Sequence, residues 1–240
     1  MAKTKKQQAQ LVKAMFEAAY PGDIEAMRRL LDEGGDPNGL PKGYELSVLE
    51  LAASNKEMPE LTRMLLKAGA KPTPAAVCRA AKGGAVETLK MLLAAGGNPN
   101  GQMRSGRAPI MRCALELLNM SGQEPGPRRK KLELLLNAGA DVNSRRTGSP
   151  AAMYMVYDRT YGERVFALTN AATRASIIQR AFLPHGMEDD MRRDLVELAR
   201  LFLGKSGFVK KRKQIEDAVS DVLNKQPGAQ VRYKRLIGAK

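Results

Sequence analysis

One segment in the C-terminal part of the chain carries the residue types of a phosphate-binding loop. Gly204-Lys205-Ser206 matches the last three positions of that motif. The motif also needs a glycine five positions before Gly204, because consecutive backbone amides must wrap around the phosphates. That position is Ala199, inside an expected helix. The segment therefore does not predict a nucleotide site.

The titratable residues near position 185 are the other candidates for chemistry. His185 is the only histidine, so any acid–base relay or histidine-ligated metal site would depend on it. It lies in a Pro-Gly turn without an evident partner, which is typical of a solvated loop residue. The carboxylates of 188–190 occupy consecutive positions of an expected helix first turn, where they point in different directions and suit the helix dipole. The sequence predicts no catalytic centre, no metal site and no cofactor.

Composition limits the compartment and the size of the fold. The chain has 240 residues, 43% of them apolar, which is enough for one or two domains. No apolar run approaches the ~20 residues of a membrane-spanning helix, and the start is polar and basic without a signal core. Cys78 and Cys113 are expected to be small buried thiols of a reducing compartment. We expect a cytoplasmic protein, with the cytoplasm or nucleus of a host as the alternative.

The formal charge of +15 is concentrated at the two ends of the chain. Residues 1–13 hold four basic residues and no acidic ones, and residues 205–240 hold ten basic and three acidic ones. Such clusters are usually solvated helix faces, but they also suit nucleic acid or an acidic protein surface. The candidate contacts are Lys210, Lys211, Arg212, Lys213, Arg232, Lys234 and Arg235.

A short phrase returns four times and indicates the elements of the fold. It contains paired leucines, then a glycine four positions after the first leucine, then a Pro-Asn or a related pair. The leucines close the apolar face of a helix, and the glycine can adopt the left-handed conformation that ends it. The four copies are 30–38, 65–73, 92–100 and 135–143.

The residues before two of these phrases complete a larger unit. Segments 18–31 and 80–93 align without a gap, and each contains the end of a helix, a glycine turn and a second helix with apolar residues at helical spacing. Each unit is therefore predicted to be a helical hairpin followed by a loop.

Together these residues resemble the ankyrin repeat family. Gly106–Ala114 carries the sequence that opens the family's first helix, and weaker copies stand at 47–53 and 149–152. The resemblance covers about residues 12–155. It implies an all-α fold, a solenoid of four to five irregular stacked helix-turn-helix units with an expanded helical C-terminal cap.

The expected boundaries follow the repeated phrase. We expect a basic N-terminal segment (1–11), repeats over 12–148, a degenerate fifth repeat or helical cap (149–207) and a basic C-terminal helix and tail (208–240). The repeat units are about 12–38, 44–73, 74–100 and 106–143. Further helices are expected at 150–158, 163–182, 187–203 and 214–223.

The chain departs from the regular pattern of the family in two ways. The phrase glycines are 35, 27 and 43 residues apart, whereas the regular unit has ~33. The inner-helix histidine is replaced by Phe16, Glu50, Cys78 and Met111, so the polar ties that this histidine makes between neighbouring loops are expected to be missing.

The resemblance implies protein recognition through loops and inner helices. We expect a non-enzymatic adaptor or steric inhibitor that binds a protein with an acidic or mixed surface, without a membrane or a small-molecule substrate. A phage or intracellular-bacterial protein directed at a host factor is one setting. The alternative is a nucleic-acid-associated adaptor that uses its basic ends, and homo-oligomerisation stays open. The expected partner-binding residues are Leu40, Lys42, Tyr44, Glu50, Met103, Arg104, Arg107, Met111, Arg145, Arg146 and Tyr154.

Overall fold

The structure is a computed structural model of the chain that describes residues 4–103, 106–118, 126–144, 151–154, 165, 167–170 and 173. The chain divides into two compact units, Met1–Asp141 and Val142–Lys240. The described residues form helices and connecting loops and contain no strand, so the prediction of an all-α chain is confirmed for this part.

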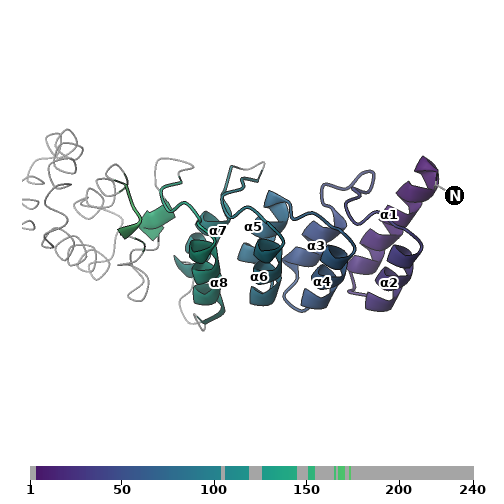
Figure 1. Cartoon of the computed structure of the whole chain (residues 1–240), viewed down its shortest axis with the longest axis horizontal. Coiled ribbons are helices and arrows are strands. Elements are labelled where there is room, and N and C mark those ends of the chain that lie inside the picture. Colours follow the sequence, from purple (N-terminus) through teal and green to yellow (C-terminus); the bar gives the residue numbers. More distant parts are fainter. Residues whose placement is uncertain are drawn as a thin grey trace, which may run out of the picture. The chain divides into compact units, whose positions relative to one another are not determined.

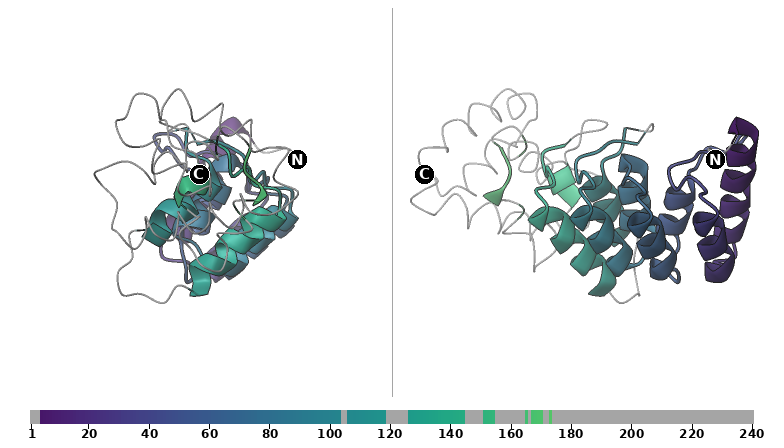
Figure 2. Two further views of the ribbon diagram at one scale, coloured as in Figure 1. Left: turned by 90° about the vertical axis from the view of Figure 1, so that its left-hand side faces the viewer. Right: turned by 45° about the vertical axis from the view of Figure 1, so that its right-hand side comes forward.

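Eight helices of the first unit form four successive hairpins. They are α1 (Lys5–Ala19), α2 (Ile24–Asp32), α3 (Val48–Ser54), α4 (Pro59–Lys67), α5 (Pro74–Lys82), α6 (Val86–Ala94), α7 (Pro109–Leu118) and α8 (Gly126–Asn137). Each odd-numbered helix packs on the even-numbered helix that follows it, and also on the odd-numbered helix of the next hairpin. The even-numbered helices pack on one another in the same order. Figures 1 and 2 show the resulting two rows, an inner row of α1, α3, α5 and α7 and an outer row of α2, α4, α6 and α8.

Polar side chains fix where several helices begin. Thr4 and Gln7 form a capping box at the start of α1, and Ser47 and Glu50 form one at α3. Each box satisfies backbone N–H groups that have no partner inside the helix. Because α1 begins at Lys5, most of the basic segment 1–11 is the first part of an inner helix.

The repeated leucine–glycine phrase ends the outer helices as predicted. Gly34, Gly69, Gly96 and Gly139 have φ angles of 82°, 92°, 87° and 80°. In each case the glycine N–H donates to the carbonyl of the second leucine, and the next N–H donates to the carbonyl of the first. The first copy, for example, has Gly34 N to Leu31 O at 2.8 Å and Gly35 N to Leu30 O at 2.9 Å. These two hydrogen bonds form a Schellman motif, which requires a residue in the left-handed conformation at the glycine position.

The core lies between the two rows. Leu61, Leu65, Leu89 and Leu92 of the outer row are fully buried. The inner row contributes many small side chains, which let its helices approach closely: Ala52, Ala53, Ala76, Ala80, Ala81 and Ala114 are all buried. Cys78 and Cys113 are free and buried, which confirms that part of the prediction.

Asparagine side chains link the segment that follows the outer helix of one hairpin to the equivalent segment of the next hairpin. Asn38 donates through Nδ2 to Gly69 O at 3.1 Å and accepts at Oδ1 from Lys71 N at 2.8 Å. Asn100 repeats the pair with Gly139 O at 3.0 Å and Asp141 N at 2.6 Å. Each amide therefore satisfies one backbone acceptor and one backbone donor of the following unit.

The same tie occurs within the second unit. Asn143 donates to Leu168 O at 3.3 Å, and Asn170 N donates to Asn143 Oδ1 at 2.8 Å. Leu168–Asn170 therefore makes the same two hydrogen bonds to Asn143 that Gly69–Lys71, after α4, makes to Asn38. The prediction of one helix over 163–182 is wrong, because Leu168–Asn170 is a non-helical turn. Its carbonyl and amide bond to Asn143 instead of continuing a helical ladder.

Other parts of the second unit are described only locally. The short 3₁₀ helix η1 (Ala151–Tyr154) lies within the helix expected over 150–158, and its first amides donate to Ser144 O and Val142 O at 2.9 and 2.8 Å. The helices expected at 187–203 and 214–223 lie outside the described residues.

Candidate functional site

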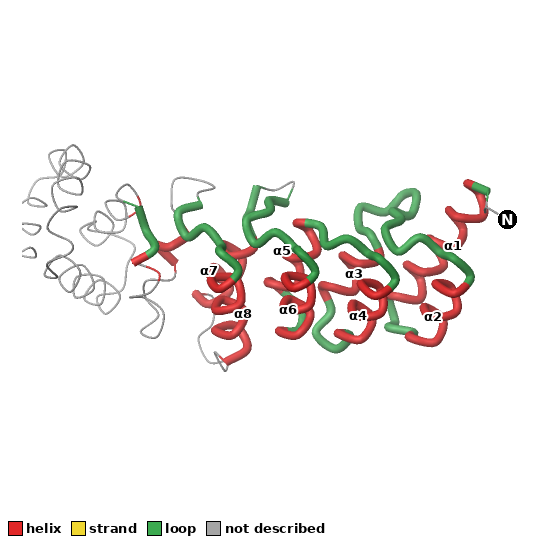
Figure 3. The backbone as a smooth tube through the Cα atoms, in the orientation of Figure 1, coloured by secondary structure: helices red, strands yellow, loops and turns green. Residues whose placement is uncertain are grey.

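The loops between hairpins lie along one edge of the first unit. Figure 3 shows them in green beside the inner row, whereas the tight turns inside the hairpins lie at the opposite edge. The connections from α2 to α3 and from α6 to α7 are long, while residues 68–73 between α4 and α5 make a short one. The long connections therefore project two separate loops from the same edge.

The base of the first loop, residues 39–46, is packed on α1. Pro41 is buried, and a Cβ at Gly39 would meet the Val12 side chain. Tyr44 N donates to Pro41 O at 3.1 Å and closes a turn. The Tyr44 ring also lies on Phe16 of α1, with centroids 4.4 Å apart and planes tilted by 48°. The loop is therefore held in place by its own base.

The tip of this loop presents apolar and basic side chains to solvent. Leu40 is 59% exposed and Tyr44 is 38% exposed. Lys42 between them is also exposed. Exposed Leu40 beside Lys42 on an anchored loop is typical of a contact with another macromolecule, because exposing the leucine contributes nothing to the fold, whereas the Tyr44 ring also packs on Phe16.

The second loop, residues 101–108, carries fewer exposed candidates. Met103 and Arg107 are half-buried. Gly106 N donates to Met103 O at 2.7 Å, and Gly106 has a φ of 72°. The Cys78 thiol lies 3.5 Å from Arg107 O, so this loop too is attached to an inner helix.

Two predicted contact residues have roles inside the fold. Met111 is only 5% exposed, so its prediction as a contact is wrong, and it acts as a packed apolar side chain of α7. Glu50 is half-buried and both its carboxylate oxygens are used. Oε2 accepts from Ser47 N at 3.2 Å and Oε1 accepts from the Thr73 hydroxyl at 2.8 Å.

The predicted loss of polar ties at the histidine position is also wrong for two of the four residues. Glu50 reaches Thr73 in the next connection, and Cys78 reaches the backbone of the second loop. Carboxylate and thiol groups thus replace the imidazole at these positions. Phe16 makes an aromatic contact with the loop instead.

The other predicted site residues fall in η1 or outside the described residues. Tyr154 falls in η1. Arg104, Arg145, Arg146 and the basic residues Lys210, Lys211, Arg212, Lys213, Arg232, Lys234 and Arg235 lie outside the described residues.

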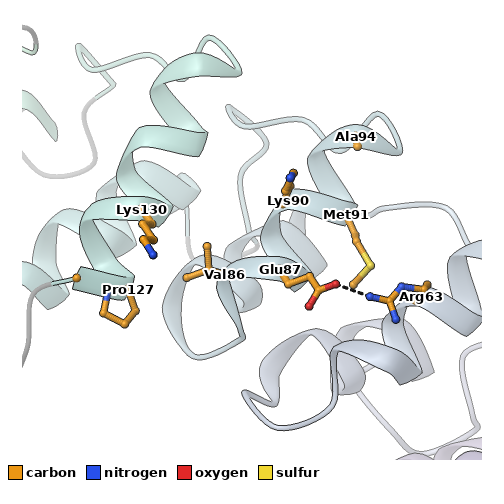
Figure 4. Close-up of a pocket in the computed structure, with 9 residues that line it drawn as sticks. Arg63, Val86, Glu87, Lys90, Met91, Ala94, Pro127 and Lys130 are labelled. Carbon is orange, nitrogen blue, oxygen red and sulfur yellow. Dashed lines mark hydrogen bonds and ion pairs between the residues drawn. The ribbon is translucent and has the colours of Figure 1, made fainter.

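A shallow groove runs across the outer row, and sequence reasoning did not single out its residues. It has a volume of about 670 Å³ and lies over α6 and the start of α8. Figure 4 shows Val86 and Met91 of α6 and Pro127 of α8 along it, with Lys90 and Lys130 beside them. Arg63 of α4 pairs with Glu87 at one side. Its apolar floor and charged margin make the groove a second possible contact surface.

The thiols are in environments that suppress reactivity. Burial raises the pKa of Cys78 to about 11 and the pKa of Cys113 to about 12. A nucleophilic cysteine needs the opposite shift, since the thiolate is the reactive form. In the part of the chain that the structure describes, no group of three or more His, Cys, Asp or Glu residues could hold a metal ion. No described helix has the length and apolarity needed to cross a membrane.

Comparison of the sequence with protein-family models and with curated proteins found no match.

Proposed function

We propose that the chain is a non-enzymatic protein-binding module built on an irregular ankyrin-type array. Support for the array comes from the two rows of hairpins, the glycine-ended outer helices and the asparagine ties between exits. The edge loops correspond to the recognition loops that the resemblance implies. The module acts as an adaptor or as a steric inhibitor of its partner.

The exposed tip of the first loop carries this proposal. Leu40, Lys42 and Tyr44 combine exposed apolar area with one positive charge on a loop whose base is fixed. A fixed loop loses little conformational entropy on binding, so its apolar contacts are converted more fully into affinity. Lys42 favours an acidic group on the partner, and the exposed Glu45 on the same loop favours a basic one, so this loop suits a partner with a mixed surface.

The test is affinity purification of the full chain from a lysate of the source organism or its host. The lysate is treated with nuclease and washed at ~0.5 M salt, which suppresses phosphate-driven binding. Mass spectrometry then identifies retained proteins. One protein in stoichiometric amount supports the proposal. Loss of all bound material after nuclease treatment instead favours the alternative, a nucleic-acid-associated adaptor that uses the basic ends.

Variants of the retained complex locate the surface. Leu40→Asp combined with Lys42→Glu should lower partner recovery by about tenfold or more, since interface anchors contribute 2 kcal/mol or more. Tyr20→Asp is the matched control, because Tyr20 is 76% exposed but lies next to the tight turn of the first hairpin. Met91→Asp tests the outer groove. Full recovery with the loop variant and loss with Met91→Asp would move the binding surface to that groove.

A further inference from the structure

A second cavity lies at the turn edge of the first unit and is lined mainly by cations. Its volume is about 310 Å³. Lys56 comes from the turn between α3 and α4, Lys82 from the end of α5, and Arg128 and Lys131 from the first turns of α8. Among the described residues, Glu116 of α7 is the only acidic one that lines it. The described lining therefore brings four positive charges from three hairpins together with one negative charge.

These cations form no ion pair with a described residue. None of the ion pairs found among the described residues includes Lys56, Lys82, Arg128 or Lys131. Arg128 Nη1 is buried and has no hydrogen-bond partner among the described residues. A buried guanidinium nitrogen without an acceptor is unfavourable, because it loses its hydration without replacement.

Lys131 is the most deeply placed of the four. It is only 4% exposed, and its ammonium donates to Ala81 O at 3.4 Å. An ammonium group has three N–H donors, so one long bond leaves most of its capacity unused. Burial lowers the pKa of Lys131 from its ordinary value, with Lys56 and Arg128 acting in the same direction and Glu116 opposing them. An anion in the cavity would favour the charged form.

The backbone of the third hairpin adds to this environment. Ala85 and Val86 line the cavity at the start of α6, and Ala85 provides no side-chain cap. The first N–H groups of a helix carry partial positive charge and accept anions readily. The start of this nine-residue helix therefore lines the same cavity as the four cations.

We infer that this cavity binds a small anion of the phosphate class, with Lys131 and Arg128 as its direct ligands. Arginine and lysine together supply the planar and the point-charge contacts that phosphate oxygens accept. The volume exceeds that of a single phosphate, so a pyrophosphate or a phosphate ester fits. The phosphate group is either a free small anion or part of a phosphorylated side chain.

The test is titration of the full chain with inorganic phosphate and pyrophosphate at constant ionic strength, followed by calorimetry. Saturable pyrophosphate binding is expected, with a rise in the thermal midpoint because the ligand binds only the folded state. A phosphoserine peptide and its unphosphorylated form make the second arm. Binding of the phosphopeptide alone would identify a protein-borne phosphate, and binding of pyrophosphate as well would identify a free anion.

Adjacent lysines of α8 provide a matched pair of variants. Lys131→Met should weaken binding by about tenfold or more through loss of a charge-assisted bond. Lys130→Met should leave binding within about twofold, because Lys130 is exposed and lies along the outer groove. Arg128→Gln is the second variant if Lys131→Met does not fold. Unchanged affinity in Arg128→Gln and Lys131→Met, or no saturable binding by any of these probes, would overturn the inference.

Discussion

Asn38, Asn100 and Asn143 make the same pair of hydrogen bonds although the loops around them differ in sequence. Each uses its amide as one donor and one acceptor toward backbone atoms. Thr73 stands at the equivalent position of the second phrase and cannot do this, because a hydroxyl is too short and has no second polar atom. It caps α5 and donates to Glu50 instead.

Replacement of these asparagines tests the tie. Asn38→Ala and Asn100→Ala should each lower the free energy of unfolding by about 1–3 kcal/mol, since each removes two hydrogen bonds and leaves backbone groups to be solvated. Gln102→Ala is the control, because Gln102 is an exposed amide two residues from Asn100 with no hydrogen bond in the described structure. Urea unfolding measures the three changes. Equal effects of Asn100→Ala and Gln102→Ala would show that the tie does not contribute.

The buried thiols predict a dependence of stability on alkaline pH. The thiol pKa values rise from 9.0 to about 11 for Cys78 and about 12 for Cys113 on folding. Their contribution is complete below pH 9 and is lost as pH rises from 9 to 12, because only the unfolded chain releases these protons there. The stability of the native chain should therefore fall more steeply above pH 9 than that of a Cys78→Ala, Cys113→Ala variant.

Denaturant unfolding of both proteins between pH 7 and 11 checks this difference in slope. The lowered pKa of Lys131 acts in the opposite direction and adds stability as pH approaches the ordinary lysine value. Because Cys113 and Lys131 interact electrostatically, Cys78→Ala alone is the variant in which the Lys131 contribution is least changed. Parallel curves would mean that the thiols are solvated in the folded state.

At the scale of elements, the close approach of two hairpins depends on Gly84. Gly84 lies in the turn between α5 and α6, and this turn packs against the last residues of α3. A Cβ at position 84 would collide with the Ala53 carbonyl oxygen and lie 2.9 Å from Ala80 Cα. Both are backbone atoms, so neither can rotate away.

Gly84→Ala should consequently destabilise the first unit by about 1–3 kcal/mol or more, the usual range for overpacking. Gly126→Ala is the matched control, because a Cβ there meets nothing within 4 Å and the residue begins α8. It should be neutral or stabilising by less than about 1 kcal/mol. Thermal unfolding followed by circular dichroism separates the two variants. A neutral Gly84→Ala would show that the hairpins can move apart.

The elements that sequence predicted well are those defined by local chemistry. The leucine–glycine phrase specifies helix ends within a few residues, so all four were found. The turn at Leu168 was missed because it lacks glycine and depends on the distant Asn143. Lys131 belongs to the basic run 128–131, whose pattern does not predict burial, because that burial arises from packing against residues far away in the chain. The exposed Leu40 and Tyr44 were predictable because they lie in a loop between two phrases.

At the scale of the first unit, the main contacts join each hairpin to its neighbours. The stability of each hairpin should therefore depend mainly on its own packing and on its contacts with the adjacent hairpins, so hairpins can differ in stability. Leu89→Ala, which creates a cavity at a fully buried position of α6, should cost about 2–5 kcal/mol. In this variant, backbone amides of the second to fourth hairpins should lose more protection against hydrogen exchange than those of the first hairpin.

Leu40→Ala is the control for this experiment, because Leu40 is exposed and should leave exchange unchanged. Mass spectrometry of peptic fragments resolves the four hairpins. A uniform loss of protection over all of them would indicate that the unit unfolds in one step.

The asparagine ties have a consequence for how such a chain can change over evolution. Each amide recognises only main-chain atoms of the next hairpin, so it is indifferent to the residues between them. Residues can be inserted or removed between the tied backbone atoms without breaking the tie, and the two tied intervals of the phrase do differ, at 35 and 43 residues. The edge loops can thus change in length and sequence while the hydrogen bonds that join these hairpins are kept.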